Sequence, residues 1–463
     1  MTKQHATGSL EPALAELSAI CPQRCATAAT VCDQHAGTLT GLSRQPPDVV
    51  VFPETIEEVQ AIVLVAARYR LPLIAFGAGT SLEGQVNAPC GGISIDLSRM
   101  ARIVRVGEGD LDVTVEPGVT LDQLNTALRD TGLFFPVDPG AGTATLGGMA
   151  STRASGTTTV RYGAMRENVL AMKVVLADGT LIGTGTRARK SAAGYDLTRL
   201  FVGAEGTLGI VVELTLRLHP RPEAVMAGIA AFPAIAAAAS ASATAVQTGL
   251  TMQRIELLDP AMLRIVNQVS GTNLPADGPV LFVEVAGSPA CVAEHMEGFK
   301  AIAADLGGTW LRDETSENER RVLWKARHDA FWSIRSAFPG RSFLVTDVCV
   351  PVSRLAECLD ETVQDLKQNG LLGPIVGHVG DGNFHTVLVY DAGAVDEQER
   401  IQAYLDRLVA RALRMEGTCT GEHGIGQGKA RYLAKEAGPA LGVMRQIKSA
   451  LDPLGLMNPG KFV

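Results

Sequence analysis

The alternation of apolar and polar residues predicts a strand–helix–strand unit near the start of the chain. Asp48–Pro53 is a short apolar run typical of a strand, and Leu71–Phe76 is another. Between them, Thr55–Arg70 has the apolar spacing of an amphipathic helix, with Thr55 as its N-cap and Glu58 three residues later. The preceding residues 1–45 are expected to be helical and then irregular.

The same alternation of strands and helices continues along the chain. Val169–Leu176 is expected to be a strand that ends in a hairpin turn at Ala177-Asp178-Gly179. Farther on, the pattern predicts two strands around an alanine-rich helix, and then two more strands. The ranges are Val225–Phe232, a helix up to Gly249, Gln253–Leu258, Pro279–Val285 and Asn383–Tyr390.

Three glycine-rich segments interrupt this pattern, at Gly77–Gly84, Pro136–Gly156 and Gly203–Val211. A glycine-rich loop directly after a strand presents unobstructed backbone N–H groups, the usual way to hold a phosphate. The first loop is not the dinucleotide fingerprint G-x-G-x-x-G, since no clear helix follows Gly84, and taken alone it is equally well a plain turn. Three such loops in one domain favour an extended ligand, and a pyrophosphate-containing dinucleotide fits.

Composition is that of a globular protein. The 463 residues are 46% hydrophobic and 19% charged, which predicts two or three domains. The net charge of −8 argues against nucleic-acid binding. Residues 1–20 lack the features of a signal peptide, and the alanine-rich 226–246 is a poor membrane span because it contains Pro233. We expect a cytoplasmic monomer or homodimer, and the sequence leaves a peripheral contact with the inner membrane open.

The eight cysteines form no C-x-x-C motif. Cys21, Cys25 and Cys32 lie close together in the sequence, where free thiols on a helix are favoured and a metal or iron–sulfur site is the alternative. Unpaired cysteines suit a reducing compartment.

The stretch 377–429 has the strongest chemical pattern. Its runs Gly377–His385 and Gly417–Gly426 hold three of the chain's eight histidines, and Glu422 precedes the last of them. Two imidazoles and a carboxylate form a ligand set for a catalytic metal, whereas glycine-rich turns with satisfied surface histidines are the alternative. Glu422 and His423 are neighbours on a predicted loop, so one can bind metal while the other moves protons.

Six segments together resemble one known family. They are FGAGTSLEG, PVDPGAGTATLGGMAS, GYDLTRLFVGAEGTLGIV, GHVGDGNFH, GTCTGEHGIG and LDPLGLMNPGK. From about Pro46 to Val463 the chain is similar to the FAD-linked D-2-hydroxy-acid dehydrogenases, a branch of the vanillyl-alcohol-oxidase-type flavoproteins. Within that branch it is most similar to the cytochrome-type D-lactate dehydrogenases.

The resemblance implies an α+β fold, in which a split FAD-binding domain of the vanillyl-alcohol-oxidase type carries an inserted substrate domain. Residues 46–224 are expected to form the FAD-binding domain, after an N-terminal helical segment at 1–45. Residues 225–415 are expected to form the substrate (cap) domain, a ferredoxin-like sheet with helices on one face. Residues 416–463 are expected to return to the FAD domain and complete the active site.

The resemblance also implies the roles of the histidines. His378, His385 and Glu422 are expected to bind a divalent metal such as Zn or Mn, although the ligand set does not choose between these and Fe. His423 is expected to act as the base that takes the substrate's hydroxyl proton.

Substrate contacts are implied for Asn383, which shares a strand face with His385, and for Arg327. An arginine fork can grip a carboxylate bidentately. On pattern alone, however, Arg327 reads as a surface charge in the basic run 320–327. The implied reaction is the oxidation of a D-2-hydroxy acid, most simply D-lactate to pyruvate.

The sequence also bears on the substrate's side chain. Members of the family that act on D-2-hydroxyglutarate carry a lysine just before the strand that ends in the aspartate matched here by Asp347. No lysine lies between Lys325 and Lys367, which favours D-lactate or a larger apolar acid. Arg335 or Arg341 could substitute for that lysine, so D-2-hydroxyglutarate stays an alternative. Glycolate, the substrate of other members of the family, is a further alternative. A metal-dependent hydrolase is the alternative from another class, and it would leave the three glycine-rich loops unexplained.

The resemblance implies that FAD is held by small residues of the glycine-rich loops and their neighbours. These are Pro53, Gly77, Ala78, Gly79, Thr80, Ser81, Gly84, Pro139, Thr143, Gly147, Gly148, Ser151, Ser155, Gly156, Glu205, Gly206, Ile210, Val211 and Asn458. No histidine lies between His35 and His219, so non-covalent FAD is expected. Without a C-x-x-C extension for an iron–sulfur relay, electrons are expected to pass to an external cytochrome, quinone or electron-transfer flavoprotein.

Overall fold

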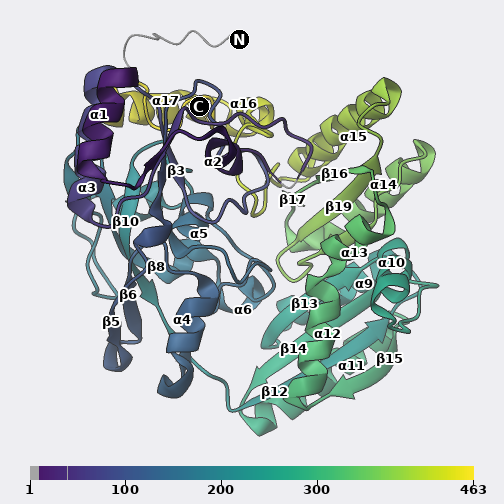
Figure 1. Cartoon of the computed structure of the whole chain (residues 1–463). Coiled ribbons are helices and arrows are strands. Elements are labelled where there is room, and N and C mark those ends of the chain that lie inside the picture. Colours follow the sequence, from purple (N-terminus) through teal and green to yellow (C-terminus); the bar gives the residue numbers. More distant parts are fainter. Residues whose placement is uncertain (1–9, 39, 463) are drawn as a thin grey trace. The chain divides into compact units, whose positions relative to one another are not determined.

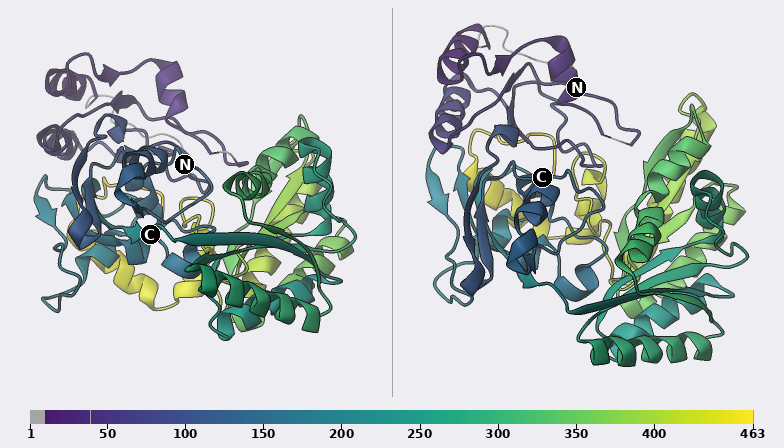
Figure 2. Two further views of the ribbon diagram at one scale, coloured as in Figure 1. Left: turned by 90° about the horizontal axis from the view of Figure 1, so that it is seen from below. Right: turned by 60° about the horizontal axis from the view of Figure 1, so that its bottom comes forward.

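The computed structural model describes residues 10–38 and 40–462, so the predicted segment 1–45 lies partly outside the described residues (Figure 1). These residues form two compact units. The first contains the chain up to Ser155, Gly163–Arg221 and everything from Glu422 onward; the second contains Gly156–Tyr162 and Pro222–Gly421. The yellow C-terminal helices in Figures 1 and 2 therefore belong to the first unit.

The first unit is built on two larger sheets, in addition to a two-stranded sheet of β7 and β11. One has the strand order β1-β2-β4-β3, with β2 and β3 parallel to β4, and the other has the antiparallel order β5-β6-β10-β8-β9. The strands are β1 Cys25–Ala26, β2 Val49–Val51, β3 Leu73–Phe76, β4 Ile93–Asp96, β5 Ile103–Gly107, β6 Asp112–Val115, β7 Leu133–Phe134, β8 Val169–Val175, β9 Leu181–Gly183, β10 Ile210–Arg217 and β11 His219–Pro220. The helices are α1 Leu10–Ile20, α2 Ala29–Gln34, α3 Ile56–Tyr69, α4 Leu121–Ala127, α5 Leu146–Thr152, α7 Met165–Asn168, α8 Leu197–Phe201, α16 Ala430–Ala437 and α17 Ala440–Leu451.

The predicted strand–helix–strand unit is confirmed. Thr55 caps α3 by accepting a hydrogen bond from the backbone N–H of Glu58 at 3.2 Å, and the helix buries its apolar face in a core shared with α1. The strand β3 also lies against the C-terminal tail. The N–H of Leu73 donates to the carbonyl of Leu456, and the N–H of Asn458 donates to the carbonyl of Leu73, both at 2.8 Å. Residues near the two ends of the sequence therefore meet at β3.

The N-terminal cysteines are packing residues. Cys21 is buried after α1 and Cys32 is buried in α2, while Cys25 lies in β1 against the same core as Cys21. The prediction that all three lie on a helix is therefore wrong for Cys21, which follows the end of α1, and for Cys25. No disulfide joins any cysteines in the described part of the chain.

The second unit is a mixed α and β structure around one long sheet. Its strand order is β15-β12-β14-β13-β18-β19-β16, and β17 also pairs with β19. The strands are β12 Ala224–Ala231, β13 Met252–Leu258, β14 Val280–Gly287, β15 Thr309–Glu314, β16 Ser342–Val345, β17 Val348–Cys349, β18 Ile375–Gly377 and β19 Asn383–Tyr390. The helices are α6 Thr159–Tyr162, α9 Ile235–Gln247, α10 Pro260–Ser270, α11 Pro289–Asp305, α12 Glu317–His328, α13 Ala330–Ala337, α14 Leu355–Gln368 and α15 Val395–Arg414.

Helices cover both faces of this sheet, which corrects the expectation of helices on one face. Ile229 and Phe282 pack against α10, α12 and α13, and Figure 1 shows α12 in front of β14. The helices α9 and α11 contact β12–β14 as well. The physical reason is that β14 is apolar except for Glu284 and is almost wholly buried, so each of its faces needs a covering layer.

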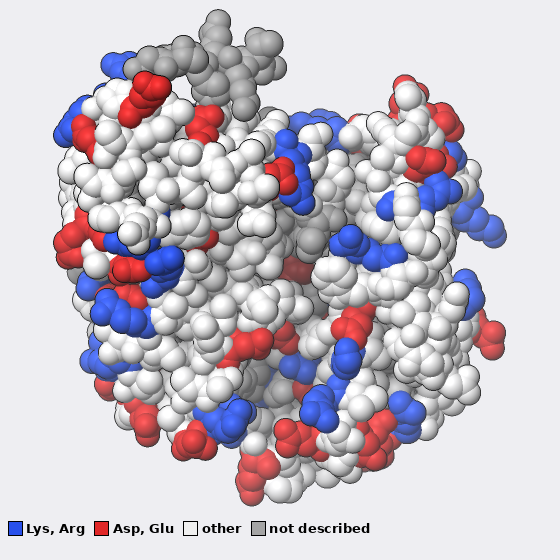
Figure 3. All heavy atoms as spheres, in the orientation of Figure 1, with Lys and Arg blue, Asp and Glu red and all other residues white. Residues whose placement is uncertain are grey.

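The described helices include none that is long and apolar enough to cross a lipid bilayer. On the face drawn in Figure 3, Lys and Arg are interspersed with Asp and Glu.

Candidate active site

A pocket in the first unit is formed where two predicted glycine-rich loops meet. One loop, Gly77–Ser81, follows β3, and the other leads into α5, whose N-cap is Thr145. The loops approach so closely that a Cβ on Gly77 would lie 2.2 Å from Oγ1 of Thr145. Only a glycine fits at this position without moving the neighbouring loop.

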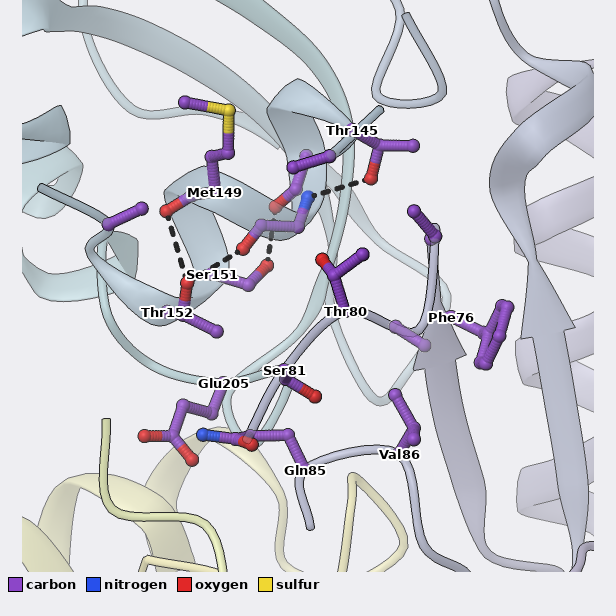
Figure 4. A pocket seen from close by; sticks show the side chains of 18 of the residues that line it. Phe76, Thr80, Ser81, Gln85, Val86, Thr145, Met149, Ser151, Thr152 and Glu205 are labelled. Carbon is purple, nitrogen blue, oxygen red and sulfur yellow. Dashed lines mark hydrogen bonds between the residues drawn. The ribbon is translucent and has the colours of Figure 1, made fainter. Parts of the chain in front are cut away.

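Most of the predicted cofactor residues line this pocket (Figure 4). They are Gly77, Ala78, Gly79, Thr80, Ser81, Pro139, Gly147, Gly148, Ser151, Ser155, Glu205, Gly206, Val211 and Asn458. The others are not among its lining residues. They are Pro53, Gly84, Thr143, Gly156 and Ile210, whose contacts with a cofactor stay predictions. Phe76, Gln85, Thr145 and Met149 also line the pocket and were not predicted. A threonine directly before the apolar Leu146 is a helix-start signal that could have found Thr145.

The pocket has the chemistry that a dinucleotide needs. Much of its wall is made of glycines and of small or hydroxyl-bearing residues, and Oγ of Ser81 is buried without a hydrogen-bond partner among the described residues. The hydroxyls of Ser151 and Thr152 donate back to carbonyls of α5 (Figure 4). A buried hydroxyl without a partner is costly unless a ligand satisfies it. FAD fits this cradle, and the Ser81 hydroxyl is one group positioned to bind it.

Glu422 and His423 line the same pocket of the first unit. Oγ of Ser155 donates to the Glu422 carboxylate at 3.2 Å, and Nε2 of Gln85 donates to the His423 carbonyl at 2.8 Å. Behind the imidazole, Oε1 of Glu83 lies 3.8 Å from Nδ1 of His423 and 3.3 Å from Nζ of Lys429. A carboxylate and an imidazole are therefore held next to each other on one loop, and Glu83 and Gln85 are supporting residues that the motifs did not reveal.

Glu205 binds the backbone of the loop that carries Glu422 and His423. Its carboxylate accepts the backbone N–H groups of Ile425 and Gly426 at 2.6 and 2.7 Å. Burial raises the pKa of Glu205 to about 7, against the opposing effect of these two hydrogen bonds. Burial also lowers the pKa of the nearby Lys461 ammonium to about 7.

His378 and His385 lie together in the second unit. Their rings meet edge to face, with centroids 5.5 Å apart. Nδ1 of His385 lies 2.9 Å from the carbonyl oxygen of Thr346, which can only accept, so this nitrogen carries the proton. Nδ1 of His378 lies 2.7 Å from Oε1 of Glu256. Burial alone would raise the pKa of Glu256, but His378 and then Arg327 outweigh it and hold the pKa below its usual value.

The carboxylate of Glu256 is thus an acceptor, and both imidazoles are protonated at Nδ1. In this tautomer each ring offers Nε2 to a metal, with the other nitrogen hydrogen-bonded as metal-binding histidines require. The residues present therefore fit a divalent metal. Arg327 does not lie on the surface, because its guanidinium is 2.7 Å from Oε2 of Glu256 and is largely buried.

Asn383 presents a hydrogen-bond acceptor. Its amide nitrogen donates to Oδ1 of Asp347 and to the carbonyl of Val348, both at 2.8 Å, which fixes the orientation of the amide. Oδ1 of Asn383 is buried and has no hydrogen-bond partner among the residues that the structure describes. Such an acceptor suits a hydroxyl of a ligand.

Comparisons with known proteins agree with this picture. A family described as "FAD binding domain" matches residues 47–185, and one described as "FAD linked oxidases, C-terminal domain" matches residues 221–462. The chain is 49% identical to probable D-lactate dehydrogenase, mitochondrial, of Danio rerio over 93% of this chain and 87% of that protein. It is 43% identical to D-lactate dehydrogenase [cytochrome], mitochondrial, of Arabidopsis thaliana over 90% of this chain and 73% of that protein.

Among solved structures, p-cresol methylhydroxylase with substrate bound aligns with a TM-score of 0.81 and 17% identity, over 99% of this chain and 98% of that one. The fold is thus that of the vanillyl-alcohol-oxidase-type flavoproteins, with a cradle for FAD. The chain belongs to the family of FAD-linked oxidases, and it is an FAD-dependent oxidoreductase rather than a hydrolase.

Proposed function

We propose that this protein oxidises D-lactate to pyruvate and uses a divalent metal to bind the substrate. The two relatives named above carry D-lactate dehydrogenase in their names and are similar along most of the chain. The observation that carries the metal part is the shared Nδ1–H tautomer of His378 and His385. With Glu422 as the third ligand, they form a set that leaves coordination positions open for a 2-hydroxy acid.

In this proposal, different side chains of the protein bind the substrate and remove its proton. Arg327 would orient the substrate carboxylate, and Oδ1 of Asn383 would accept the hydrogen bond of the substrate hydroxyl. His423 removes the hydroxyl proton while the hydrogen on C2 leaves with its electron pair. A Zn or Mn ion supplies the charge that lowers the pKa of the hydroxyl. FAD in the cradle supplies the two-electron acceptor, so that D-lactate loses one proton and one hydride and becomes pyruvate.

An external electron acceptor completes the cycle by reoxidising the flavin. A cytochrome is our choice, because the Arabidopsis thaliana relative carries that word in its name. Quinone and electron-transfer flavoprotein are the other acceptors to be compared in the assay.

The test is anaerobic mixing of purified protein with one substrate at a time, followed by the visible flavin spectrum. D-Lactate should bleach the flavin faster than L-lactate, glycolate or D-2-hydroxyglutarate. Chelation should stop the bleaching without removing the flavin, and Zn or Mn should restore it.

A pair of variants separates the metal from the flavin. His385→Ala should stay yellow but fail to respond to added metal. His295→Ala is the matched control, because His295 lies on α11 and accepts a hydrogen bond from the backbone N–H of Thr251. Full activity of thoroughly metal-free protein would remove the metal from the proposal, and faster reduction by glycolate would change the substrate.

A further inference from the structure

Glu256 connects two side chains that the proposed function treats separately. It lies on β13 and is completely buried. One of its carboxylate oxygens is 2.7 Å from Nδ1 of His378, and the other is 2.7 Å from Nη2 of Arg327. The proposed metal ligand His378 and the proposed substrate-binding residue Arg327 therefore share the carboxylate of Glu256.

The sheet creates this arrangement. Leu257 of β13 pairs with Gly377 of β18, which brings His378 beside Glu256. Arg327 lies on α12. Two earlier residues of this helix, Leu323 and Trp324, pack into the core of the second unit and so direct the following turn, which carries Arg327, toward β13. The three charged or polar side chains come from distant parts of the sequence, and each is at least nine-tenths buried.

The shared carboxylate has an electrostatic consequence. Arg327 is already neutralised by Glu256, so the pair offers no net positive charge to an anionic substrate. A substrate carboxylate that approaches Arg327 also approaches the Glu256 carboxylate, and in a buried site this repulsion is only weakly screened. A cation held by His378 is the group that can reverse the sign of the local charge.

We infer that Glu256 is a positioning residue that makes substrate binding depend on the metal. It orients His378 for the metal, and it offsets Arg327 so that a 2-hydroxy or 2-oxo acid binds tightly only once the metal is present. This inference rests on the metal site of the proposed function.

The key variant is Glu256→Gln, which keeps the size of the side chain and removes its charge. Two affinities are measured: that for Zn²⁺, by competition with a chromophoric chelator, and that of the metal-free protein for pyruvate, from the change in the flavin spectrum. Zn²⁺ affinity should fall by roughly 10–100-fold, the usual cost of losing the partner of a metal-bound histidine. Pyruvate affinity without metal should rise by about tenfold, the factor that ~1.4 kcal/mol of relieved repulsion gives.

Opposite signs for the two affinities distinguish this role from general destabilisation, which would lower both. Glu284→Gln is the matched control. Glu284 is also a buried carboxylate, on the adjacent strand β14, but it accepts hydrogen bonds from Nε1 of Trp324 and Nε2 of Gln253. It should change neither affinity.

Glu256→Asp tests the two roles apart, and also serves if the glutamine variant does not fold. The shorter side chain keeps the charge but loses its reach, so Zn²⁺ affinity should fall while metal-free pyruvate affinity stays at the parent's value. Parent-like Zn²⁺ affinity in either variant overturns the inference, as does unchanged or weaker pyruvate binding in Glu256→Gln. If the parent itself needs no metal for D-lactate oxidation, the proposed function fails instead, and that result is read from the parent alone.

Discussion

The carboxylate of Glu205 accepts a hydrogen bond from the backbone N–H of Gly426, at 2.7 Å, across 221 positions of sequence. It accepts a second from Ile425, and a Cβ on Gly424 would lie only 2.4 Å from Oε1 of Glu205. Glu205 itself lines the FAD pocket. One side chain thus joins the cofactor cradle to the loop that carries Glu422 and His423.

Glu205→Gln should misplace that loop. The amide has one acceptor oxygen, and its NH₂ group would face a backbone N–H, at a cost of about 1–3 kcal/mol. We expect flavin reduction to slow by about tenfold or more, since each 1.36 kcal/mol on the barrier is a factor of ten. Stopped-flow reduction at saturating substrate measures this. Glu58→Gln is the control, because Glu58 lies on α3 and forms an ion pair with Arg24. Equal slowing in both variants would contradict the role of Glu205 in holding the loop of Glu422 and His423.

Gly77→Ala should weaken the binding of FAD in the pocket between the glycine-rich loops. The new Cβ would lie 2.2 Å from Oγ1 of Thr145, and that hydroxyl cannot turn away freely because it caps α5 by accepting the N–H of Gly148. The loop must shift, so the purified variant should contain much less FAD per chain than the parent. Gly109→Ala is the control, since a Cβ there meets nothing within 4 Å. A variant of Gly77 that retains a full complement of FAD would mean that the loop yields easily.

Local patterns predicted local structure well. The Thr55 cap, the helix that follows it and the strand Asn383–Tyr390 depend on neighbouring residues, and the structure has them where they were expected. The glycine-rich loops were also informative. Where another segment packs closely against the backbone, a glycine is needed regardless of which part of the chain that segment comes from. The sequence could thus indicate that another group packs closely against Gly77, but not that this group is the side chain of Thr145.

The partners of the site residues could not be predicted in this way. Arg327 was expected on pattern alone to be a surface charge, yet its partner Glu256 lies 71 positions earlier and buries it. Glu205 was assigned to FAD and lines the FAD pocket, but the hydrogen bonds of its carboxylate with Ile425 and Gly426 were not predicted. Such contacts depend on sheet register and helix packing, which no short motif encodes.

Asp259 should make stability depend on pH. It caps α10 by accepting the N–H of Met262 at 2.7 Å, and burial raises its pKa to about 6, above the ordinary 3.8. The folded state then binds the proton more tightly, so the stability that Asp259 contributes is greatest below about pH 3.8 and is lost as the pH rises through about 6. Asparagine is an equally good cap and does not ionise.

Asp259→Asn should therefore gain about 1.4 kcal/mol of stability over the parent between pH 5 and pH 8, because only the last pH unit below the folded pKa of about 6 lies in that range. Thermal unfolding at the two pH values measures the gain. Asp196→Asn is the control, because Asp196 caps α8 and its pKa is lowered by hydrogen bonds from Arg199. Asp196 is ionised at both pH values, so its variant should differ from the parent by the same amount at each. A constant difference for Asp259→Asn as well would refute the expected linkage.

His423→Ala should separate proton transfer from binding. The imidazole lines the FAD pocket beside Glu422 and is supported from behind by Glu83. Without a positioned base, flavin reduction should slow by roughly 10²–10⁴-fold, while the flavin spectrum and the bound metal persist. Added imidazole should restore part of the rate by entering the space left behind, an effect that lost folding cannot produce. His219→Ala is the control, since His219 lies on β11 and hydrogen-bonds Asn168. Reduction of His423→Ala at the parent's rate would show that another group takes the proton.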